Sequence, residues 1–317
     1  MIITVTLNPT MDKTVILDEL ILGETNRVKE SRTDPGGKGI NVSRVLRTLD
    51  QSSLAMGFVS GGIGRFVEAS LNEVGILDDF IHTPGQTRTN LVIEDEKCHT
   101  TTVISEKGPE TKPHYVDELK HRLQGHCQPD SWVVYAGSAP PGIGSDVYAQ
   151  LIELSKQCGS FTALDADGEL LREGVQAKPH LIKPNRVELE RLVGKTLYTE
   201  DDILRAAEDI QALGVATVVV SMGAKGAIAV STTEAWKTIP PKVEAESTVG
   251  AGDSLLAGVI FGLVNGRGLA AALRLGTAAG AATALTAGTQ LCRREDIDRL
   301  LPQVQLERLD LPSKKAR

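Results

Sequence analysis

The sequence predicts an α/β protein with a mainly parallel central sheet flanked by helices and a second, small β-sheet. Short apolar runs alternate with longer amphipathic segments along the chain, and this alternation is typical of βαβ units. Two other segments alternate residue by residue and show little helical period. They do not fit the βαβ series, so we expect them to form the separate sheet.

The elements of the core follow from the apolar pattern in chain order. Strands are expected where short runs are apolar, at residues 2–7, 54–59, 132–136, 161–165, 180–182, 217–221 and 227–230. Helices are expected where longer stretches are amphipathic or Ala-rich, at residues 40–49, 65–74, 146–158, 186–193, 201–213, 253–264 and 269–287. Ligands of such sheets bind beyond the carboxyl ends of the strands, so the loops after strands are the place to look for functional residues.

Segments 13–33 and 87–105 are the predicted β-ribbons. They would pair into a lid over the core or into a dimer surface, and edge strands of the main sheet are the alternative that the pattern leaves open. The predicted division is therefore an α/β core at residues 1–12, 34–86 and 106–317, with a discontinuous lid at 13–33 and 87–105.

The composition excludes several classes of function. The 317 residues are 41% hydrophobic and 24% charged, with a formal net charge of −7, as in ordinary globular proteins. Aromatic residues make up only 3% and there is no basic run, which argues against a nucleic-acid partner. The four cysteines form no Cys-x-x-Cys pair, no basic leader precedes the first strand, and no apolar run is long enough to span a bilayer. A cytoplasmic protein with reduced thiols and no membrane contact is expected.

The most informative motif is Gly250-Ala251-Gly252-Asp253, a turn of small residues that runs straight into an apolar helix. The amides of Ala251, Gly252 and Asp253 can point at one spot, where the helix macrodipole also favours an anion. A carboxylate beside that spot can accept a proton from a hydroxyl that attacks a phosphoryl group. In isolation, such an Asp more often only caps its helix; the other motifs favour the catalytic interpretation.

A second glycine-rich segment, Pro35-Gly36-Gly37-Lys38-Gly39, precedes the helix expected at 40–49 and places Asn41 in its first turn. It lacks the Walker spacing and is not a P-loop. Three glycines and a Lys ahead of a helix suit a cradle for a sugar or a phosphate. A Gly-rich loop with a solvated Lys is equally compatible with the pattern.

Two further motifs follow predicted strands. Lys183-Pro184-Asn185 is followed by Glu188, three residues after Asn185 on the same helical face. This spacing forms a capping box, and it also suits water-mediated binding of Mg²⁺, an ion that keeps several waters. The turn from Ser221 through Gly223 to Gly226 is either a plain hairpin or a binding site for nucleotide phosphates.

Together and in this order, the motifs resemble those of the ribokinase-like (PfkB) carbohydrate kinases. The resemblance covers nearly the whole chain and is strongest to the branch with 1-phosphofructokinase, tagatose-6-phosphate kinase and the minor bacterial 6-phosphofructokinase. The segments that carry it are Thr6-Leu7-Asn8-Pro9 with Asp12, the Gly36–Val42 loop, Gly85-Gln86-Thr87-Arg88, Gly137-Ser138-Ala139-Pro140-Pro141-Gly142, Lys183-Pro184-Asn185 and the stretch up to Gly288-Thr289.

The resemblance implies ATP as the phosphate donor, Mg²⁺ as the metal, a phosphorylated ketohexose as the acceptor and a homodimer built through the lid. Asp253 would be the catalytic base, and the amides of Gly250, Ala251, Gly252 and Asp253 the anion hole. The other matching positions are Asp12, Gly36, Gly37, Asn41, Arg88 and Ser138 on the sugar side, Lys183, Asn185, Ser221, Gly223 and Gly226 on the nucleotide side, and Asn185 with Glu188 for magnesium.

The cations argue for a phosphorylated substrate. Lys38, Arg88 and Arg27 offer three positive charges for a phosphate, whereas a nucleoside or ribose kinase of the same fold would have no substrate phosphate to hold. The presence of Asp253 and the magnesium motif argues against a non-catalytic sugar-binding regulator. Fructose 1-phosphate, converted to fructose 1,6-bisphosphate, is the expected substrate, with fructose 6-phosphate and tagatose 6-phosphate as alternatives. Asp167 stands where the family usually has Ser, which leaves the choice of sugar open.

Overall fold

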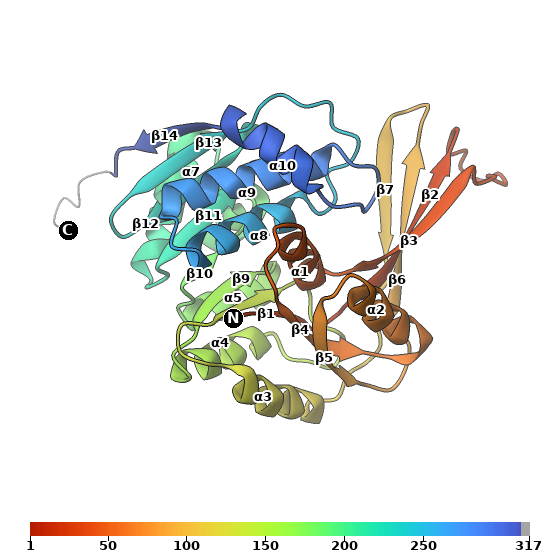
Figure 1. Ribbon diagram of the computed structural model, residues 1–317, viewed down its shortest axis with the longest axis horizontal. Helices are drawn as coiled ribbons and strands as arrows, with labels where there is room; N and C mark the ends of the chain where they lie inside the picture. Colours follow the sequence, from red (N-terminus) through yellow and green to blue (C-terminus); the bar gives the residue numbers. More distant parts are fainter. Residues whose placement is uncertain (312–317) are drawn as a thin grey trace.

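The main sheet of the computed structural model, which describes residues 1–311, has ten strands in the order β14-β13-β12-β11-β10-β9-β8-β1-β4-β5 (Figure 1). The strands from β5 to β11 pair in parallel, and β12, β13 and β14 extend the sheet with antiparallel pairing. Their bounds are β1 Ile2–Thr6, β4 Leu54–Val59, β5 Leu77–His82, β8 Trp132–Ala136, β9 Phe161–Asp165, β10 Leu181–Ile182, β11 Thr217–Ser221, β12 Ala227–Ser231, β13 Ala235–Ile239 and β14 Gln305–Leu309.

Helices cover both faces of this sheet. One face carries α1 Lys38–Thr48, α2 Gly61–Glu73, α8 Ala251–Val264, α9 Leu269–Ala284 and α10 Arg294–Leu300. The other carries α3 His114–His126, α4 Val147–Gln157, α5 Gly168–Gln176, α6 Arg186–Val193 and α7 Glu200–Ala212. Short 3₁₀ turns occupy Gly223–Lys225 and Leu301–Gln303. None of the helices within residues 1–311 has the length and apolarity needed to cross a bilayer.

Burial on both faces explains why the central strands are continuously apolar. In β8, Trp132 and Val134 pack into the cluster under α8 and α9, whereas Val133 and Tyr135 pack into the cluster under α3 and α4. Successive side chains of a strand point to opposite faces, so a strand covered twice needs apolar residues at every position. The predicted α/β fold is confirmed.

The second sheet stands apart from the core. It contains β2 Thr10–Leu17, β3 Glu30–Gly36, β6 Arg88–Asp95 and β7 Thr100–Ser105 in the order β3-β2-β6-β7. Figure 1 shows it projecting beside the helical layers. The sequence left open that these segments are edge strands of the main sheet, but they form a sheet of their own. Strand β2 begins at Thr10 and β3 ends at Gly36, so this pair extends three residues beyond each end of the predicted ribbon at 13–33.

The carboxyl ends of the parallel strands place the polar loops together. β1 leads through Asn8 directly into β2 of the small sheet, and β8 leads into Ser138. β9 ends at Asp165 and β10 is followed by Lys183. Because parallel strands share a carboxyl edge, these loops meet at one side of the sheet, as expected for a ligand site of this fold.

Candidate active site

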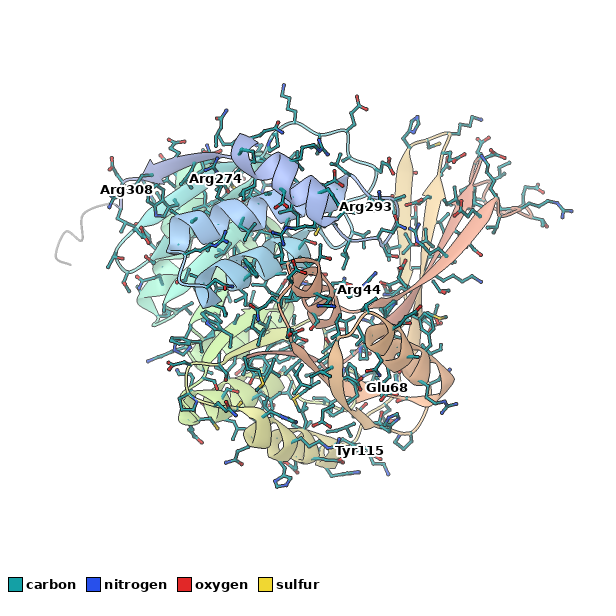
Figure 2. The ribbon with its side chains drawn as sticks, viewed as in Figure 1. Arg44, Glu68, Tyr115, Arg274, Arg293 and Arg308 are labelled. Carbon is teal, nitrogen blue, oxygen red and sulfur yellow. The ribbon has the colours of Figure 1, made fainter. Side chains whose placement is uncertain are left out.

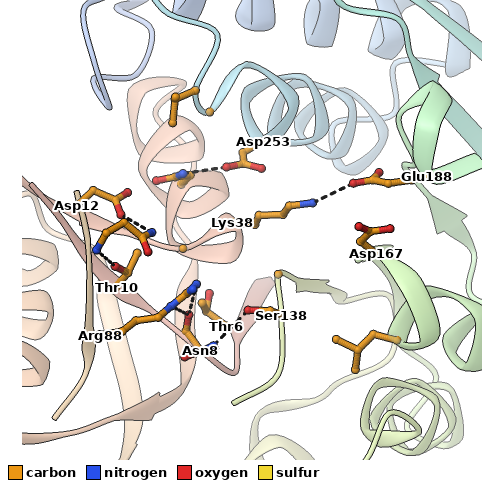
Figure 3. Close-up of a pocket in the computed structure, with 17 residues that line it drawn as sticks. Thr6, Asn8, Thr10, Asp12, Lys38, Arg88, Ser138, Asp167, Glu188 and Asp253 are labelled. Carbon is orange, nitrogen blue, oxygen red and sulfur yellow. Dashed lines mark hydrogen bonds and ion pairs between the residues drawn. The ribbon is translucent and has the colours of Figure 1, made fainter. Parts of the chain in front are cut away.

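A cavity of about 380 Å³ lies at this edge, between the small sheet and the start of α8 (Figure 3). We call it the sugar pocket, after the ligand expected from the sequence. It is lined by Thr6, Asn8, Thr10, Asp12, Gly37, Lys38, Asn41, Arg88, Asn90, Gly137, Ser138, Asp167, Leu170, Glu188, Val249, Gly250 and Asp253. The predicted sugar-side residues Asp12, Gly37, Lys38, Asn41, Arg88 and Ser138 are among them.

Asp12 is fixed from two directions at the lid side of the pocket. Asn90 of β6 donates a hydrogen bond to its Oδ1 at 2.9 Å. Gly36 lies directly against it, since a Cβ at Gly36 would come within 2.1 Å of Asp12 Oδ2. Burial raises the pKa of Asp12, against the opposing hydrogen bonds from Asn90 and Thr10. Gly36 therefore acts by making room for this carboxyl group, which lines the pocket.

Arg88 begins β6 and is anchored by main-chain carbonyls. Its Nε and Nη2 donate to Asn8 O at 3.3 and 3.0 Å, and its Nη1 donates to Glu106 O at 2.9 Å. A guanidinium has five N–H donors, so two remain for a ligand. Asn8 also donates to Ser138 Oγ at 3.2 Å. These contacts hold a cation and a hydroxyl at one end of the pocket.

Asp253 is held at the start of α8 by Asn41 of α1, whose Nδ2 donates to Asp253 Oδ2 at 2.8 Å. The side chain is 8% exposed. Burial and the neighbouring Asp165 raise the pKa of Asp253 to about 6, against the opposing effects of Lys38 and Asn41. At neutral pH the carboxyl group is therefore ionised but has a proton affinity well above that of a solvated Asp, which suits a general base.

Lys38 lies in an ion cluster between two cavities. Its Nζ is 3.7 Å from Glu188 Oε1 (Figure 3). The same Nζ is 2.8 Å from Asp165 Oδ1, and Lys183 Nζ is 3.0 Å from Asp165 Oδ2. Burial disfavours the charged form of Lys38, but Asp165, Asp253 and Glu188 outweigh it and raise its pKa. Lys183 and Lys38 in turn lower the pKa of the buried Asp165. Lys38 is thus a fixed cation.

The second cavity, of about 740 Å³, adjoins the first. We call it the nucleotide pocket, after the ligand expected from the sequence. All the predicted nucleotide-side residues line it, namely Lys183, Asn185, Ser221, Gly223 and Gly226. Its apolar wall comes from the loop after β13 and from α9, with Pro240, Pro241, Val243, Ala245, Gly280, Ala281 and Ala284. Four residues line both cavities: Lys38, Glu188, Gly250 and Asp253. The junction between the two spaces is therefore where Asp253 lies.

The α8 N-terminus faces this junction. Gly250 has a φ of 79°, in the left-handed region that favours glycine, and a Cβ there would come within 2.7 Å of Leu291. The amide of Ala251 is partly engaged, because it donates to Thr248 O at 3.3 Å. No protein acceptor within residues 1–311 takes the N–H groups of Gly252 and Asp253. The free donors of the expected anion hole are therefore centred on Gly252 and Asp253 rather than on Ala251.

Asn185 and Glu188 form the capping box that the sequence left as one interpretation. Asn185 Oδ1 accepts from Glu188 N at 2.9 Å, and Glu188 Oε2 accepts from Asn185 N at 2.7 Å. Glu188 Oε1 remains directed toward Lys38 and the cavities. Among residues 1–311, no three His, Cys, Asp or Glu side chains are arranged to hold a metal ion. The donors present thus fit Mg²⁺ held through water and phosphate oxygens, not in a protein cage.

The structure gives the positions of the other two cations predicted for the substrate phosphate. Arg27 is exposed on the segment between β2 and β3 and does not line the pocket of its own chain. Lys38 lines the sugar pocket, and its Nζ is paired with Asp165 at the junction. The pairing of Lys38 with Asp165, which is 127 residues away, could not be predicted from the sequence. The residues that sequence reasoning missed are Asn8, Asn90 and Asp165, although all three stand at or near strand ends.

Known proteins are similar to this chain over nearly its whole length. The model of the "pfkB family carbohydrate kinase" matches residues 5–296. A 1-phosphofructokinase of Borreliella burgdorferi is 34% identical, over 97% of this chain and 98% of its own. A tagatose-6-phosphate kinase of Staphylococcus epidermidis is 32% identical, over 96% and 99%. The structure of phosphofructokinase-2 from Escherichia coli with substrates and products superposes with a TM-score of 0.91 at 30% identity, covering 95% of this chain and 98% of that one. The chain belongs to the pfkB family of carbohydrate kinases, enzymes that transfer a phosphoryl group to a sugar hydroxyl.

Proposed function

We propose that this enzyme transfers the γ-phosphoryl group of ATP to fructose 1-phosphate and forms fructose 1,6-bisphosphate. The observation that carries the proposal is the position of Asp253, which lines both the sugar pocket and the nucleotide pocket. An acceptor hydroxyl and a donor phosphate placed in the two cavities would meet at this carboxylate.

Each residue of the site has its own role in the proposed reaction. Asp253 accepts the proton of the attacking hydroxyl, while Asn41 keeps the carboxylate oriented through the bond to Oδ2. The N–H groups of Gly252 and Asp253 and the Lys38 ammonium are aimed at charge that develops on the transferring group, where fixed donors act most strongly. Arg88 and Asp12 position the sugar, since correct placement of the reactants is most of what a kinase contributes.

Magnesium would be held near Glu188 and Asn185 through water. When bound, it neutralises charge on the phosphate oxygens of ATP. The carboxylate Oε1 of Glu188 supports this assignment, because it faces both cavities while Oε2 is used by the capping box.

The proposed sugar rests on the names of the relatives and on the positions of Arg88 and Asp253 in the sugar pocket. The relatives named 1-phosphofructokinase are 32–37% identical, and they favour fructose 1-phosphate. The likeness to a tagatose-6-phosphate kinase and to phosphofructokinase-2 keeps tagatose 6-phosphate and fructose 6-phosphate as second candidates. Each of these ketoses carries a phosphate at one end and a free hydroxyl at the other. Arg88 and Asp253 would hold those two ends.

Two further features belong to the proposal. The small sheet would act as a lid and pair with the lid of a second subunit, for which the exposed β7 offers a surface. The cysteines are all free thiols, which supports a reducing compartment such as the cytoplasm.

Steady-state kinetics with ATP and the three sugar phosphates test the substrate. The proposal predicts the highest kcat/KM for fructose 1-phosphate, with a strict requirement for Mg²⁺. A higher value for fructose 6-phosphate or tagatose 6-phosphate would replace the proposed substrate by that sugar.

A further inference from the structure

A separate cavity on the far side of α1 carries an excess of positive charge. It has a volume of about 370 Å³, close to that of the sugar pocket, and shares no lining residue with it. Its lining residues are Asp34, Arg44, Arg47, Thr48, Val74, Gln290, Leu291, Cys292 and Arg293. We call it the arginine cavity. Figure 2 labels Arg44 on α1 and Arg293 just before α10.

Three arginines and only one acidic residue line this cavity, so its positive charge is not balanced. Arg44 and Arg47 lie three apart on one face of α1, and Arg293 comes from the other wall. Asp34, the single acidic residue of the lining, is bonded by Arg44 at 3.5 Å and also by Arg32 at 3.1 Å. Within residues 1–311, neither Arg47 nor Arg293 has an acidic partner within 4 Å.

A purely structural role accounts for only part of this arrangement. Arg47 is in the last turn of α1, where a cation stabilises the helix macrodipole, and its Nε donates to Val74 O at 2.9 Å. Arg44 supports the turn before α1 by donating to Pro35 O at 3.0 Å. Neither role explains Arg293, whose charge adds to theirs. Like charges facing one small cavity repel one another, and an anion placed among them removes the repulsion.

We propose that the arginine cavity binds a small molecule that carries a phosphate group. Guanidinium groups bind phosphate in a bidentate manner. Arg44 is half-buried, and Arg47 and Arg293 are exposed at the rim of the cavity, where a ligand from solvent can reach them. The hydroxyl of Thr48 and the side-chain amide of Gln290 add neutral hydrogen-bonding groups to the same wall. The volume suits a ligand of about the size of a monosaccharide phosphate, or inorganic phosphate itself.

The cavity borders two segments of the active site. Arg44 holds Pro35, which immediately precedes Gly36 of the loop beside Asp12. Leu291, in the opposite wall, lies against Gly250 at the start of α8. A ligand that draws these walls together would therefore contact the supports of both the sugar pocket and the α8 N-terminus.

The test uses inorganic phosphate as the probe and thermal unfolding as the readout, so it does not depend on turnover. The wild type is compared with the double variant R47Q/R293Q and with R294Q, at constant ionic strength maintained with chloride. Arg294 is the matched control, because it adjoins Arg293 but pairs with Asp50 and Asp298 and does not line the cavity. Phosphate bound in the catalytic pockets stabilises all three proteins alike, so differences between them report the arginine cavity.

The proposal predicts that the phosphate-dependent rise in Tm is the same in wild type and R294Q. In R47Q/R293Q the apparent Kd for the cavity should increase by at least about ten-fold, as expected when charged hydrogen bonds are lost. An identical phosphate dependence in all three proteins would overturn it. If the double variant does not fold, wild-type crystals soaked in selenate decide: anomalous density beside Arg47 and Arg293 supports the site, and density confined to other places refutes it.

Discussion

Arg88 offers the sharpest test of how the substrate is recognised. Three of its N–H donors are used by the carbonyls of Asn8 and Glu106, which hold the guanidinium in place before a substrate arrives. The two remaining donors are the ones proposed to bind the substrate phosphate. Losing a charged hydrogen-bonding partner costs about 1.5–3 kcal/mol. For R88A, the KM for the sugar phosphate should therefore increase by roughly ten- to a hundred-fold, while the KM for ATP changes little.

The same variant separates phosphate recognition from general damage to the pocket. Wild type and R88A are assayed with fructose 1-phosphate and with fructose, which lacks the phosphate. If Arg88 binds the phosphate, the ratio of the two kcat/KM values falls by about the same ten- to a hundred-fold. If Arg88 only ties β6 to Asn8, both sugars lose activity equally and the ratio is unchanged. An equal rise in the KM values for sugar and ATP would also refute the assignment.

Three further predictions follow from the site and the lid. Because the pKa of Asp253 is raised to about 6 and only the ionised carboxylate accepts a proton, kcat should fall as the pH drops below about 6. The variant N41A removes a hydrogen bond that favours the ionised carboxylate, so it should shift this fall in kcat to higher pH. A pH-rate profile that is flat from 5 to 8 would contradict the role of Asp253. E188Q retains an acceptor for the capping box but loses the charge, so the Mg²⁺ concentration for half-maximal activity should rise by about ten- to a hundred-fold; an unchanged Mg²⁺ dependence would leave only the capping function. Val103 and Ile104 of β7 are 47% and 55% exposed, so light scattering should show a dimer that I104E dissociates, and a monomeric wild type at working concentration would refute the lid pairing.

Much of the fold was predictable because the core obeys local rules. The central strands are buried on both faces, so their apolar runs stood out, and β1, β8 and β9 were found close to their true bounds. Elements with a mixed pattern were missed. β5 carries Asp78 and Asp79 in its sequence, and β14 is exposed along most of its length. Helix α3 buries only Val116, Leu119 and Leu123, which is a narrow apolar stripe.

The site was predictable as a set of motifs but not as a set of contacts. The turn at Gly250 and the loop at Gly36 were visible from their glycines, whose local requirements are encoded in a few adjacent residues. The bond between Asn41 and Asp253 joins residues 212 apart, and only the packing of α1 on α8 brings them together. For the same reason, the acidic partner of Lys38 could not be predicted from the sequence. Lys38, expected at the substrate phosphate, lines the sugar pocket and also pairs with Asp165.

The central claim is that Asp253 is the catalytic base, and D253N alters it with the least disturbance. Asn is isosteric, and its side-chain oxygen can still accept the hydrogen bond from Asn41. The folded protein raises the pKa of Asp253 above the ordinary value of 3.8, so at pH 8 the ionised group favours unfolding. D253N should therefore be at least as stable as the wild type at pH 8, which thermal unfolding verifies.

The decisive measurement is kcat of folded D253N with saturating ATP, Mg²⁺ and fructose 1-phosphate. A positioned general base contributes about 10²–10⁴-fold to the rate. The account predicts a fall in kcat of that size, with the affinities for sugar and ATP within a few-fold of the wild type. A folded D253N enzyme that turns over at nearly the wild-type rate would contradict it.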